Sequence, residues 1–153
     1  MELKRANTKE ERENVKKLYL TAFPKEERKP FDLITEKQAE GGADIFYLED
    51  NGEFSGLAIP AMDKDIVLLV FFAIADGKRG GGCGSKALQM IMEKYKGKRF
   101  ILEIEDTSAE AGNKEQRIRR KSFYMKNGLI NTGLMANVMG VEMEVLGNTT
   151  DIT

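Results

Sequence analysis

The central feature of the sequence is a continuous apolar run, IVLLVFFAI, over residues 66–74. A strand with one exposed face alternates apolar and polar residues, so an unbroken run predicts a strand packed on both faces in the middle of a sheet. The run leads into the segment ADGKRGGGCGS and then into KALQMIMEKY, where Leu88, Ile91 and Tyr95 share one helical face. This stretch therefore predicts a strand, a glycine-rich loop and a helix.

Two further helices are predicted before this run. Thr8 and Glu11 have the spacing of a capping box, and the apolar residues after them recur at helical spacing until Pro24. A shorter helix is predicted over residues 31–40, with Pro30 at its first position and two glycines after its end.

The remaining apolar segments predict strands that flank the central one. These strands are expected over residues 1–7, 45–49, 54–59, 99–105, 129–135 and 138–146. Asn51-Gly52, between the second and third of them, is a strong hairpin signal. A last helix is expected at about residues 113–127. Because a helix separates the central strand from the strand after it, these two should run parallel, joined by a right-handed crossover.

The glycine-rich loop has the chemistry of an anion-binding site. Gly80, Gly81, Gly82 and Gly84 allow the backbone to take positive φ and allow a ligand to approach without meeting a Cβ. The helix that opens at about Gly82 to Ser85 directs its free N–H groups and its positive dipole end into the same loop. A phosphate group is the expected ligand.

Two common phosphate motifs do not fit this loop. A P-loop needs Lys followed by Ser or Thr, but Ser85 precedes Lys86 and Ala87 follows it. The dinucleotide fingerprint also fails, because Ser85 stands where the third glycine belongs and because the loop lies in mid-chain. A nucleotide kinase is therefore disfavoured, and a nucleotide-binding enzyme stays open only as a third interpretation.

The run Arg79-Gly80-Gly81-Gly82-Cys83-Gly84 resembles the Arg-x-x-Gly-x-Gly/Ala signature of the GNAT acyltransferases. The expected element order, β-α-α-β-β-β-α-β-α-β-β, is similar to that of the same family over nearly the whole chain. The resemblance implies an α/β GNAT fold, with a mixed central sheet of six to seven strands, about four helices, and the fourth and fifth strands splayed apart. It implies one GNAT domain over residues 1–146 and a polar tail over residues 147–153.

Acyl-CoA lies between the splayed strands in this family, so the resemblance implies acetyl-CoA as a cosubstrate. Backbone groups at the end of the central strand would pair with the pantetheine arm, and the glycine loop would hold the pyrophosphate, with Lys78, Arg79 and Lys86 as nearby cations. Asn113 matches the asparagine that often hydrogen-bonds the pantetheine arm or a bound water. The residues implied for the strand and the loop are Phe72, Ala73, Ile74, Arg79, Gly80, Gly81, Gly82, Cys83, Gly84 and Ser85.

The segment from Ser122 to Gly128 is similar to the end of the family's fourth helix, where an aromatic-Tyr pair precedes a glycine. Tyr124 then matches the tyrosine that commonly protonates the CoA thiolate as it leaves, and the resemblance implies the same role here. The alternative is a core tyrosine beside Phe123 that buries its ring and satisfies only its hydroxyl.

The general base does not carry over from the family. A glutamate on the fourth strand is common there, but the corresponding position in this chain is Val70. Glu103 and Glu105 on the next strand are the nearest carboxylates, and alternation places both on one face. Glu105 is preferred, because it lies at the carboxyl end of the strand, where open α/β sheets place ligands. A solvated edge carboxylate, with deprotonation through water, stays open as the alternative.

Composition narrows the chemistry further. The chain has 153 residues, of which 41% are hydrophobic and 32% charged, which suits one domain with a core of its own. It has no histidine, which removes the usual general base, the Ser-His and Cys-His pairs and most zinc sites, so no metal is expected. Its one cysteine, Cys83, is interpreted as a small buried hydrophobe rather than as an acyl-carrying nucleophile.

Charge and hydropathy bear on the expected partners. The net charge is −1, so no nucleic acid is expected, and the basic run at residues 117–121 is interpreted as a solvated helix surface. No apolar run approaches the ~18 residues that span a bilayer, and the charged N-terminal residues do not resemble a signal peptide. No membrane partner and a cytoplasmic location are therefore expected, and a homodimer stays open.

These features predict an N-acetyltransferase that moves an acetyl group from acetyl-CoA to a primary amine of a small molecule or a peptide, by direct attack in a ternary complex. The alternative is a non-catalytic acyl-CoA-binding sensor or interaction module with the same fold, which the absence of an evident base favours. A sensor would bind its ligand without turning over any amine, and it would be indifferent to Tyr124→Phe.

Overall fold

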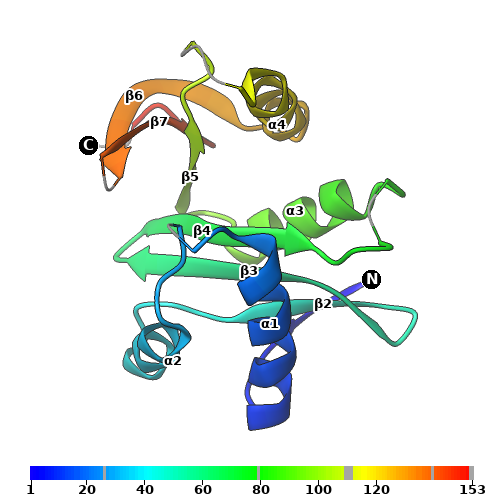
Figure 1. The fold of residues 1–153 in the computed structure, drawn as a ribbon. Coiled ribbons are helices and arrows are strands. Elements are labelled where there is room, and N and C mark those ends of the chain that lie inside the picture. The colour runs from blue at the N-terminus through cyan, green and yellow to red at the C-terminus, as the bar shows by residue number, and fades with distance from the viewer. Residues whose placement is uncertain (26, 79, 109–111, 139, 152–153) are drawn as a thin grey trace.

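The computed structural model describes residues 1–25, 27–78, 80–108, 112–138 and 140–151. Its elements follow the predicted order: β1 (Glu2–Arg5), α1 (Lys9–Ala22), α2 (Phe31–Glu40), β2 (Phe46–Asp50), β3 (Glu53–Asp63), β4 (Ile66–Ile74), α3 (Cys83–Lys94), β5 (Arg99–Glu105), α4 (Lys114–Lys126), β6 (Ile130–Val138) and β7 (Val141–Gly147). Within the described residues, seven strands form one sheet in the order β1-β2-β3-β4-β5-β7-β6. All neighbouring strands are antiparallel except β4 and β5, which are parallel as predicted, so the predicted fold class is confirmed (Figure 1).

The sheet divides between β4 and β5. These two strands pair only near their starts, and the last pair joins Leu68 to Ile101. β4 continues to Ile74 and β5 to Glu105, so their carboxyl halves diverge, and Figure 1 shows β5, β7 and β6 turned away from the other strands. The predicted splay of the fourth and fifth strands is therefore confirmed.

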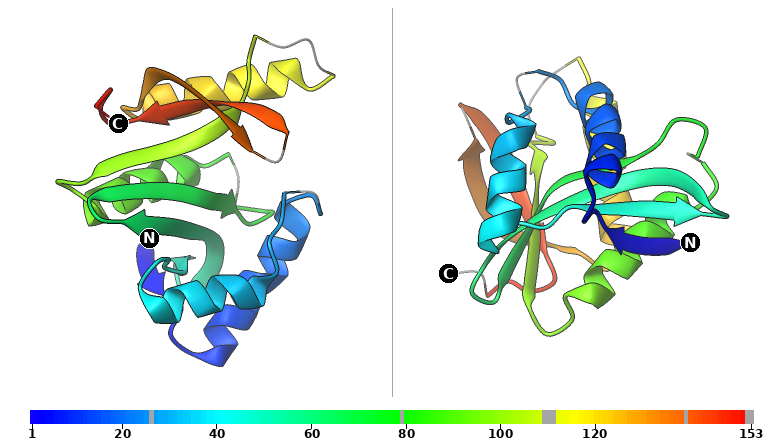
Figure 2. Two further views of the ribbon diagram at one scale, coloured as in Figure 1. Left: turned by 90° about the vertical axis from the view of Figure 1, so that its left-hand side faces the viewer. Right: turned by 90° about the horizontal axis from the view of Figure 1, so that it is seen from below.

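Helices cover both faces of the part of the sheet formed by β1 to β4. α1 and α2 lie together on one face and α3 lies on the other, as the views of Figure 2 show. Tyr19 and Phe31 contribute to the core under α1 and α2, and Leu88 and Ile91 contribute to the core under α3. Burying each such side chain contributes about 1.5–3 kcal/mol, which holds both helix layers against the central strands. None of the described helices has the length and apolar character of a membrane span.

β4 packs against both cores, as its unbroken apolar sequence predicts. Val67 and Leu69 belong to the core under α3, whereas Phe71 belongs to the core under α1 and α2. The change of face comes from a β-bulge, because consecutive residues of β3 lie opposite Leu69 and Phe71 and leave Val70 without a ladder partner. The bulge therefore re-aims the half of β4 that diverges from β5.

Two strands extend further than the sequence pattern predicts. The pattern ends the third strand at Ile59, before Pro60, but β3 continues to Asp63. Pro60 is tolerated because it lies at the register shift between β3 and β4, where the ladder is interrupted. β6 continues to Val138 rather than Met135, because its ladder with β7 reaches that residue.

Local signals at helix ends and turns are mostly confirmed. Glu11 N–H donates to Thr8 Oγ1 at 3.1 Å, and Thr8 N–H donates to Glu11 Oε1 at 3.0 Å, which is the reciprocal pattern of a capping box. Asn51 and Gly52 have φ values of 53° and 78°, as the hairpin between β2 and β3 requires. Pro30 is the N-cap of α2 rather than its first residue, because its ψ of 129° is outside the helical range.

Candidate active site

The glycine-rich loop joins the end of β4 to α3, and its conformation depends on glycine. Gly80 and Gly82 have φ values of 89° and 76°, in the left-handed region where a residue with a Cβ is strained. Gly81 has no such φ, and a Cβ there would meet no atom within 4 Å. Nothing in the described protein therefore requires glycine at position 81, whereas a ligand that approaches the backbone closely would require it.

α3 starts at this loop with amide groups that have no partner within the helix. Gly82 is the N-cap without a side-chain cap, and its carbonyl accepts from Lys86 N–H at 3.1 Å. The N–H groups of the first turn, from Cys83 to Ser85, have no intrahelical acceptor, and the positive end of the helix dipole lies beside them. Cys83 itself is buried, as its interpretation as a small hydrophobe predicts. The geometry of the loop and the helix start suits an anion.

The cations near the loop differ in their availability. Lys78 Nζ lies 2.6 Å from Glu53 Oε2, so this expected phosphate partner is already engaged by the hairpin between β2 and β3. Arg79, the first residue of the predicted signature, lies outside the described residues. Lys86 forms no ion pair with any described residue and is the cation that remains available within the first turns of α3.

The C-terminal part of α4 is tied to the start of α3. A Cβ at Gly84 would lie 3.3 Å from Phe123 Cζ, so the ring packs directly on the first turn of α3. Asn127 Nδ2 donates to Ser85 Oγ at 3.3 Å and to the Phe123 carbonyl at 2.8 Å. Gln89 Nε2 donates to the Asn127 carbonyl at 2.9 Å and to Asn127 Oδ1 at 3.2 Å. The sequence pattern missed Asn127 and Gln89, because no local signal marks a contact between two helices.

Tyr124 combines a packed ring with a free hydroxyl. Its ring is in T-shaped contact with Phe123, with centroids 5.2 Å apart, and packs against the core under α3. Its hydroxyl forms no hydrogen bond with a described residue. Burial raises the pKa of Tyr124, while the nearby charge of Arg120 lowers it, and the phenol is protonated at neutral pH. A core-packed tyrosine that is also a proton donor fits both interpretations of this residue.

The two carboxylates of β5 differ in their partners. Glu105 lies at the end of β5, and its Oε2 is 2.6 Å from Arg117 Nη2. Glu103 precedes it by two residues, on the same face, and forms no ion pair with a described residue. Burial raises the pKa of Glu103, and the positive charge of Lys29 opposes this shift. An unpaired carboxylate with a raised pKa is the better proton acceptor, so the geometry favours Glu103 over the expected Glu105.

Lys29 lies in the connection between α1 and α2. The fully buried Tyr19 donates through its hydroxyl to the Lys29 carbonyl at 2.7 Å, and the same hydroxyl accepts from Lys29 N–H at 2.7 Å. The Tyr19 ring packs on Phe23, Phe31 and Phe71. The backbone at Lys29 is therefore fixed to the core, although its side chain is exposed.

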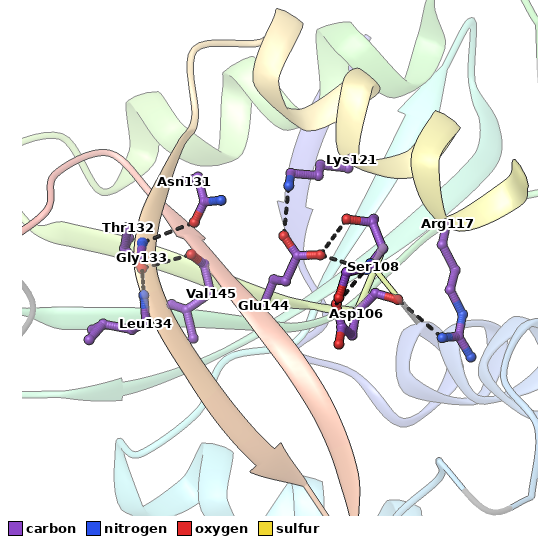
Figure 3. A network of polar contacts seen from close by, with 11 residues as sticks. Asp106, Ser108, Arg117, Lys121, Asn131, Thr132, Gly133, Leu134, Glu144 and Val145 are labelled. Atoms are coloured by element: carbon purple, nitrogen blue, oxygen red, sulfur yellow. Dashed lines mark hydrogen bonds and ion pairs between the residues drawn. The ribbon is translucent and has the colours of Figure 1, made fainter. Parts of the chain in front are cut away.

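A polar network holds the segment that follows β5 (Figure 3). One oxygen of the buried Glu144 accepts from Thr107 N–H at 2.6 Å, and the other lies 2.7 Å from Lys121 Nζ. Burial alone would raise the pKa of Glu144, but the hydrogen bonds from Lys121 and Thr107 outweigh it and leave the pKa below its usual value. Arg117 Nη1 donates to the Asp106 carbonyl at 3.2 Å. Arg117 and Lys121 both come from the basic run: Arg117 thus anchors α4 to the end of β5, and Lys121 anchors it to Glu144 of β7.

The remaining predicted residues lie at the start of α4 and on the diverging half of β4. Asn113 is the exposed N-cap of α4, and its side chain makes no capping hydrogen bond. Phe72, Ala73 and Ile74 follow the last β4–β5 pair, on the part of β4 that has no ladder with β5. These positions are compatible with a ligand that lies along β4, as the sequence predicts.

The hollows of the surface do not by themselves identify this site. A hollow of about 610 Å³ lies between α1 and α2 and is lined by none of the predicted site residues. Ser85 and Lys86, with Gln89, line a smaller and more open hollow of about 410 Å³. The chemistry of the glycine loop, rather than the volume of a cavity, therefore places the candidate site between β4, α3 and α4.

No protein-family model and no curated protein sequence matches this chain. Solved structures do match it. A protein assigned to the GNAT acetyltransferase family from Bacteroides thetaiotaomicron has a TM-score of 0.79 at 20% identity, over 96% of this chain and 86% of that one. A spermidine N-acetyltransferase SpeG chimera from Vibrio cholerae and hSSAT has a TM-score of 0.75 at 12% identity, over 98% and 97%.

An aminoglycoside 6′-N-acetyltransferase in complex with coenzyme A has a TM-score of 0.73 at 13% identity, over 100% of this chain and 99% of that one. At identities this low, the likeness establishes the fold. The chain has the GNAT fold over nearly its whole length, so the resemblance inferred from the sequence is confirmed at this level.

Proposed function

We propose that the protein is an N-acetyltransferase that transfers the acetyl group of acetyl-CoA to a primary amine, by direct attack in a ternary complex. The observation that carries the proposal is the place of the glycine loop. It joins a strand whose ladder with β5 stops at Leu68 to a helix N-terminus that no side chain caps. The fold shared with proteins named as N-acetyltransferases, one of them solved with coenzyme A, supports it.

Acetyl-CoA binds, on this proposal, mainly through backbone groups. Its pyrophosphate lies on the loop from Gly80 to Ser85, where the N–H groups at the start of α3 and the cation of Lys86 meet it. Its pantetheine arm pairs with the β5-facing edge of β4 near Phe72 and Ala73, like an added strand. The amide of Asn113 is available to the same arm.

The acceptor amine approaches from the α1–α2 side, where Glu103 is the proposed base in place of Glu105. Glu103 takes the proton of the ammonium group, directly or through a water. The amine nitrogen then bonds to the acetyl carbonyl carbon, its remaining extra proton passes to water, and the carbon–sulfur bond breaks. The Tyr124 hydroxyl donates its proton to the departing thiolate and regains one from solvent. Acid–base assistance of this kind contributes about 10²- to 10⁴-fold to the rate.

The test is release of CoA thiol from acetyl-CoA over a panel of primary amines. Release that requires both substrates, and that falls in Tyr124→Phe without a change in acetyl-CoA affinity, supports the proposal. Acetyl-CoA binding with no amine-dependent release over the whole panel would instead identify a non-catalytic acyl-CoA sensor.

A further inference from the structure

The face of β5 that carries Glu103 continues across β7 and β6 in apolar side chains. Residues directly opposite each other in an antiparallel ladder share a face, with their Cβ atoms about 4.5–5.5 Å apart. Val145 of β7 lies directly opposite Glu103. The same ladders and the alternation along each strand place four further apolar residues on this face. Together with Val145 they are called the apolar wall here: Val141 and Met143 of β7, and Ala136 and Val138 of β6.

The acidic residues of β7 lie on the opposite face. Glu142 and Glu144 alternate with the wall residues, and the buried Glu144 lies 2.7 Å from Lys121 Nζ of α4 (Figure 3). A sheet with one solvated face usually carries its polar residues on that face. In β7 the order is reversed, since Val138 and Val141 on the wall are 38% and 47% exposed. The apolar wall is therefore accessible to a ligand.

One carboxylate without a counterion stands beside the wall. Glu103 forms no ion pair with a described residue, whereas Glu105 on the same face lies 2.6 Å from Arg117 Nη2. No wall residue is charged. A single ammonium group therefore finds a complementary charge at Glu103. A second charge further along the wall would lie against apolar groups without a partner, which is costly.

Resting on the proposed function, we infer that the acceptor is a primary monoamine with an apolar substituent, such as an alkylamine or an arylalkylamine. Its ammonium group meets Glu103, and its substituent lies along the apolar wall. β7 rises about 3.4 Å per residue, so the wall is about 14 Å long from Val145 to Val141. A substituent of several carbons stays in contact with it, and Val141 determines specificity at its far end.

The experiment compares amines of one chain length that differ only at the far end. Octylamine, diaminooctane and aminooctanoate end in a methyl group, an ammonium group and a carboxylate, and they are assayed by thiol release at saturating acetyl-CoA. Octylamine should have at least about tenfold higher kcat/KM than either, although diaminooctane offers an amine at each end. From butylamine to octylamine, kcat/KM should rise about two- to fourfold per methylene, because each one leaves water for the wall.

Val141→Glu tests the wall itself, because it places a carboxylate at the far end. It should lower kcat/KM for octylamine and raise it for diaminooctane, with KM for acetyl-CoA unchanged. A loss of stability alone would lower both values and would not reverse the preference. Ile118→Glu is the matched control, since Ile118 is 45% exposed but lies on α4, and this variant should keep the preference of the wild type.

The wild-type comparisons decide the inference even if Val141→Glu does not fold. Equal or higher kcat/KM for diaminooctane or spermidine, or no dependence on chain length, would overturn it and leave acetyl transfer standing. An unchanged preference in a folded Val141→Glu variant would also overturn it, as would acetyl-CoA binding without turnover of any alkylamine. Absence of both acetyl-CoA binding and thiol release with every acceptor would overturn the proposed function itself.

Discussion

On the proposed cofactor side of the splayed strands, the loop from Gly80 to Ser85 offers backbone N–H groups, which need only contiguous glycines and a helix start. On the proposed acceptor side, the group expected to react with the substrate is a side chain, the Glu103 carboxylate of β5. A site built from backbone groups depends on few side chains, so it can keep the same ligand through many substitutions. A site built from side chains can change its ligand with each substitution. The contrast explains why the loop indicates a cofactor class while the acceptor has to be inferred from contacts.

The largest loss is expected from Gly82→Glu. This change places a side chain and a negative charge at the helix N-terminus that is proposed to hold the pyrophosphate, so acetyl-CoA affinity should fall more than about 100-fold in a calorimetric titration. Gly97→Glu is the matched control, because Gly97 also has a positive φ, of 90°, and also opens on empty space, beyond the other end of α3. Equal losses in both variants would assign the effect to backbone strain rather than to the phosphate site.

On the acceptor side, Glu103→Gln should lower kcat about 10²- to 10³-fold with little effect on acetyl-CoA affinity. Because the pKa of Glu103 is raised above 4.5, wild-type activity should fall as pH drops through that raised pKa, and the variant should lack this limb of the pH profile. A raised pKa also means that ionising Glu103 costs stability as pH rises, so the variant should melt slightly higher than wild type at neutral pH.

Glu105→Gln is the comparison for that result. It weakens the ion pair with Arg117, so it should lower the melting temperature while leaving most of kcat. A larger loss of kcat in Glu105→Gln than in Glu103→Gln would return the role of base to Glu105.

Tyr124→Phe tests the proposed role of the Tyr124 hydroxyl as the proton donor to the CoA thiolate. The ring packing is retained and the proton donor is lost, so kcat should fall about 10- to 100-fold while the Kd of acetyl-CoA stays the same. Tyr47→Phe is the control, since it removes a hydroxyl that donates to Glu11 Oε2 at 2.7 Å and should cost about 1 kcal/mol of stability with no change in kcat. Unchanged kcat in Tyr124→Phe would leave this residue with packing alone.

The smallest effect is expected from Asn127→Ala, which weakens the tie between α4 and the start of α3. The loss of the hydrogen bonds from Asn127 Nδ2 to Ser85 and from Gln89 to Asn127 Oδ1 should cost about 1–2 kcal/mol and raise KM for acetyl-CoA a few-fold, because the phosphate loop is less firmly held. The hydrogen bond from Gln89 to the Asn127 carbonyl remains. Gln38→Ala, which removes one hydrogen bond to the Ala6 carbonyl on the other face of the sheet, should lose stability without a change in that KM. Steady-state kinetics and thermal melts measure both quantities.

Most of the fold could be predicted because its signals are local. The capping box of Thr8 and Glu11, the Asn-Gly hairpin and the unbroken run of β4 each lie within a few residues. The bulge at Val70 could not be predicted, because it depends on how β4 pairs with β3. The same non-local pairing carries β3 past Pro60, where the pattern alone predicts an end.

In the candidate site too, contiguous features could be predicted from the sequence and contacts between distant residues could not. The loop from Gly80 to Gly84 was predictable because its residues are contiguous, although Arg79 lies outside the described residues. The ion pair that disfavours Glu105 as the proposed base was not, because its arginine comes from α4. Likewise, nothing near Lys78 in the sequence indicates that Glu53 engages it.

We propose that the glycine loop binds the phosphates of acyl-CoA. A thermal-shift titration of the protein with acetyl-CoA, CoA, ATP and NAD side by side tests it most directly, because a ligand that binds only the folded state raises the melting temperature. The melting temperature should rise with acetyl-CoA and CoA and change little with ATP or NAD. No shift with either CoA species, or a larger shift with ATP or NAD, would contradict the proposed role of the loop.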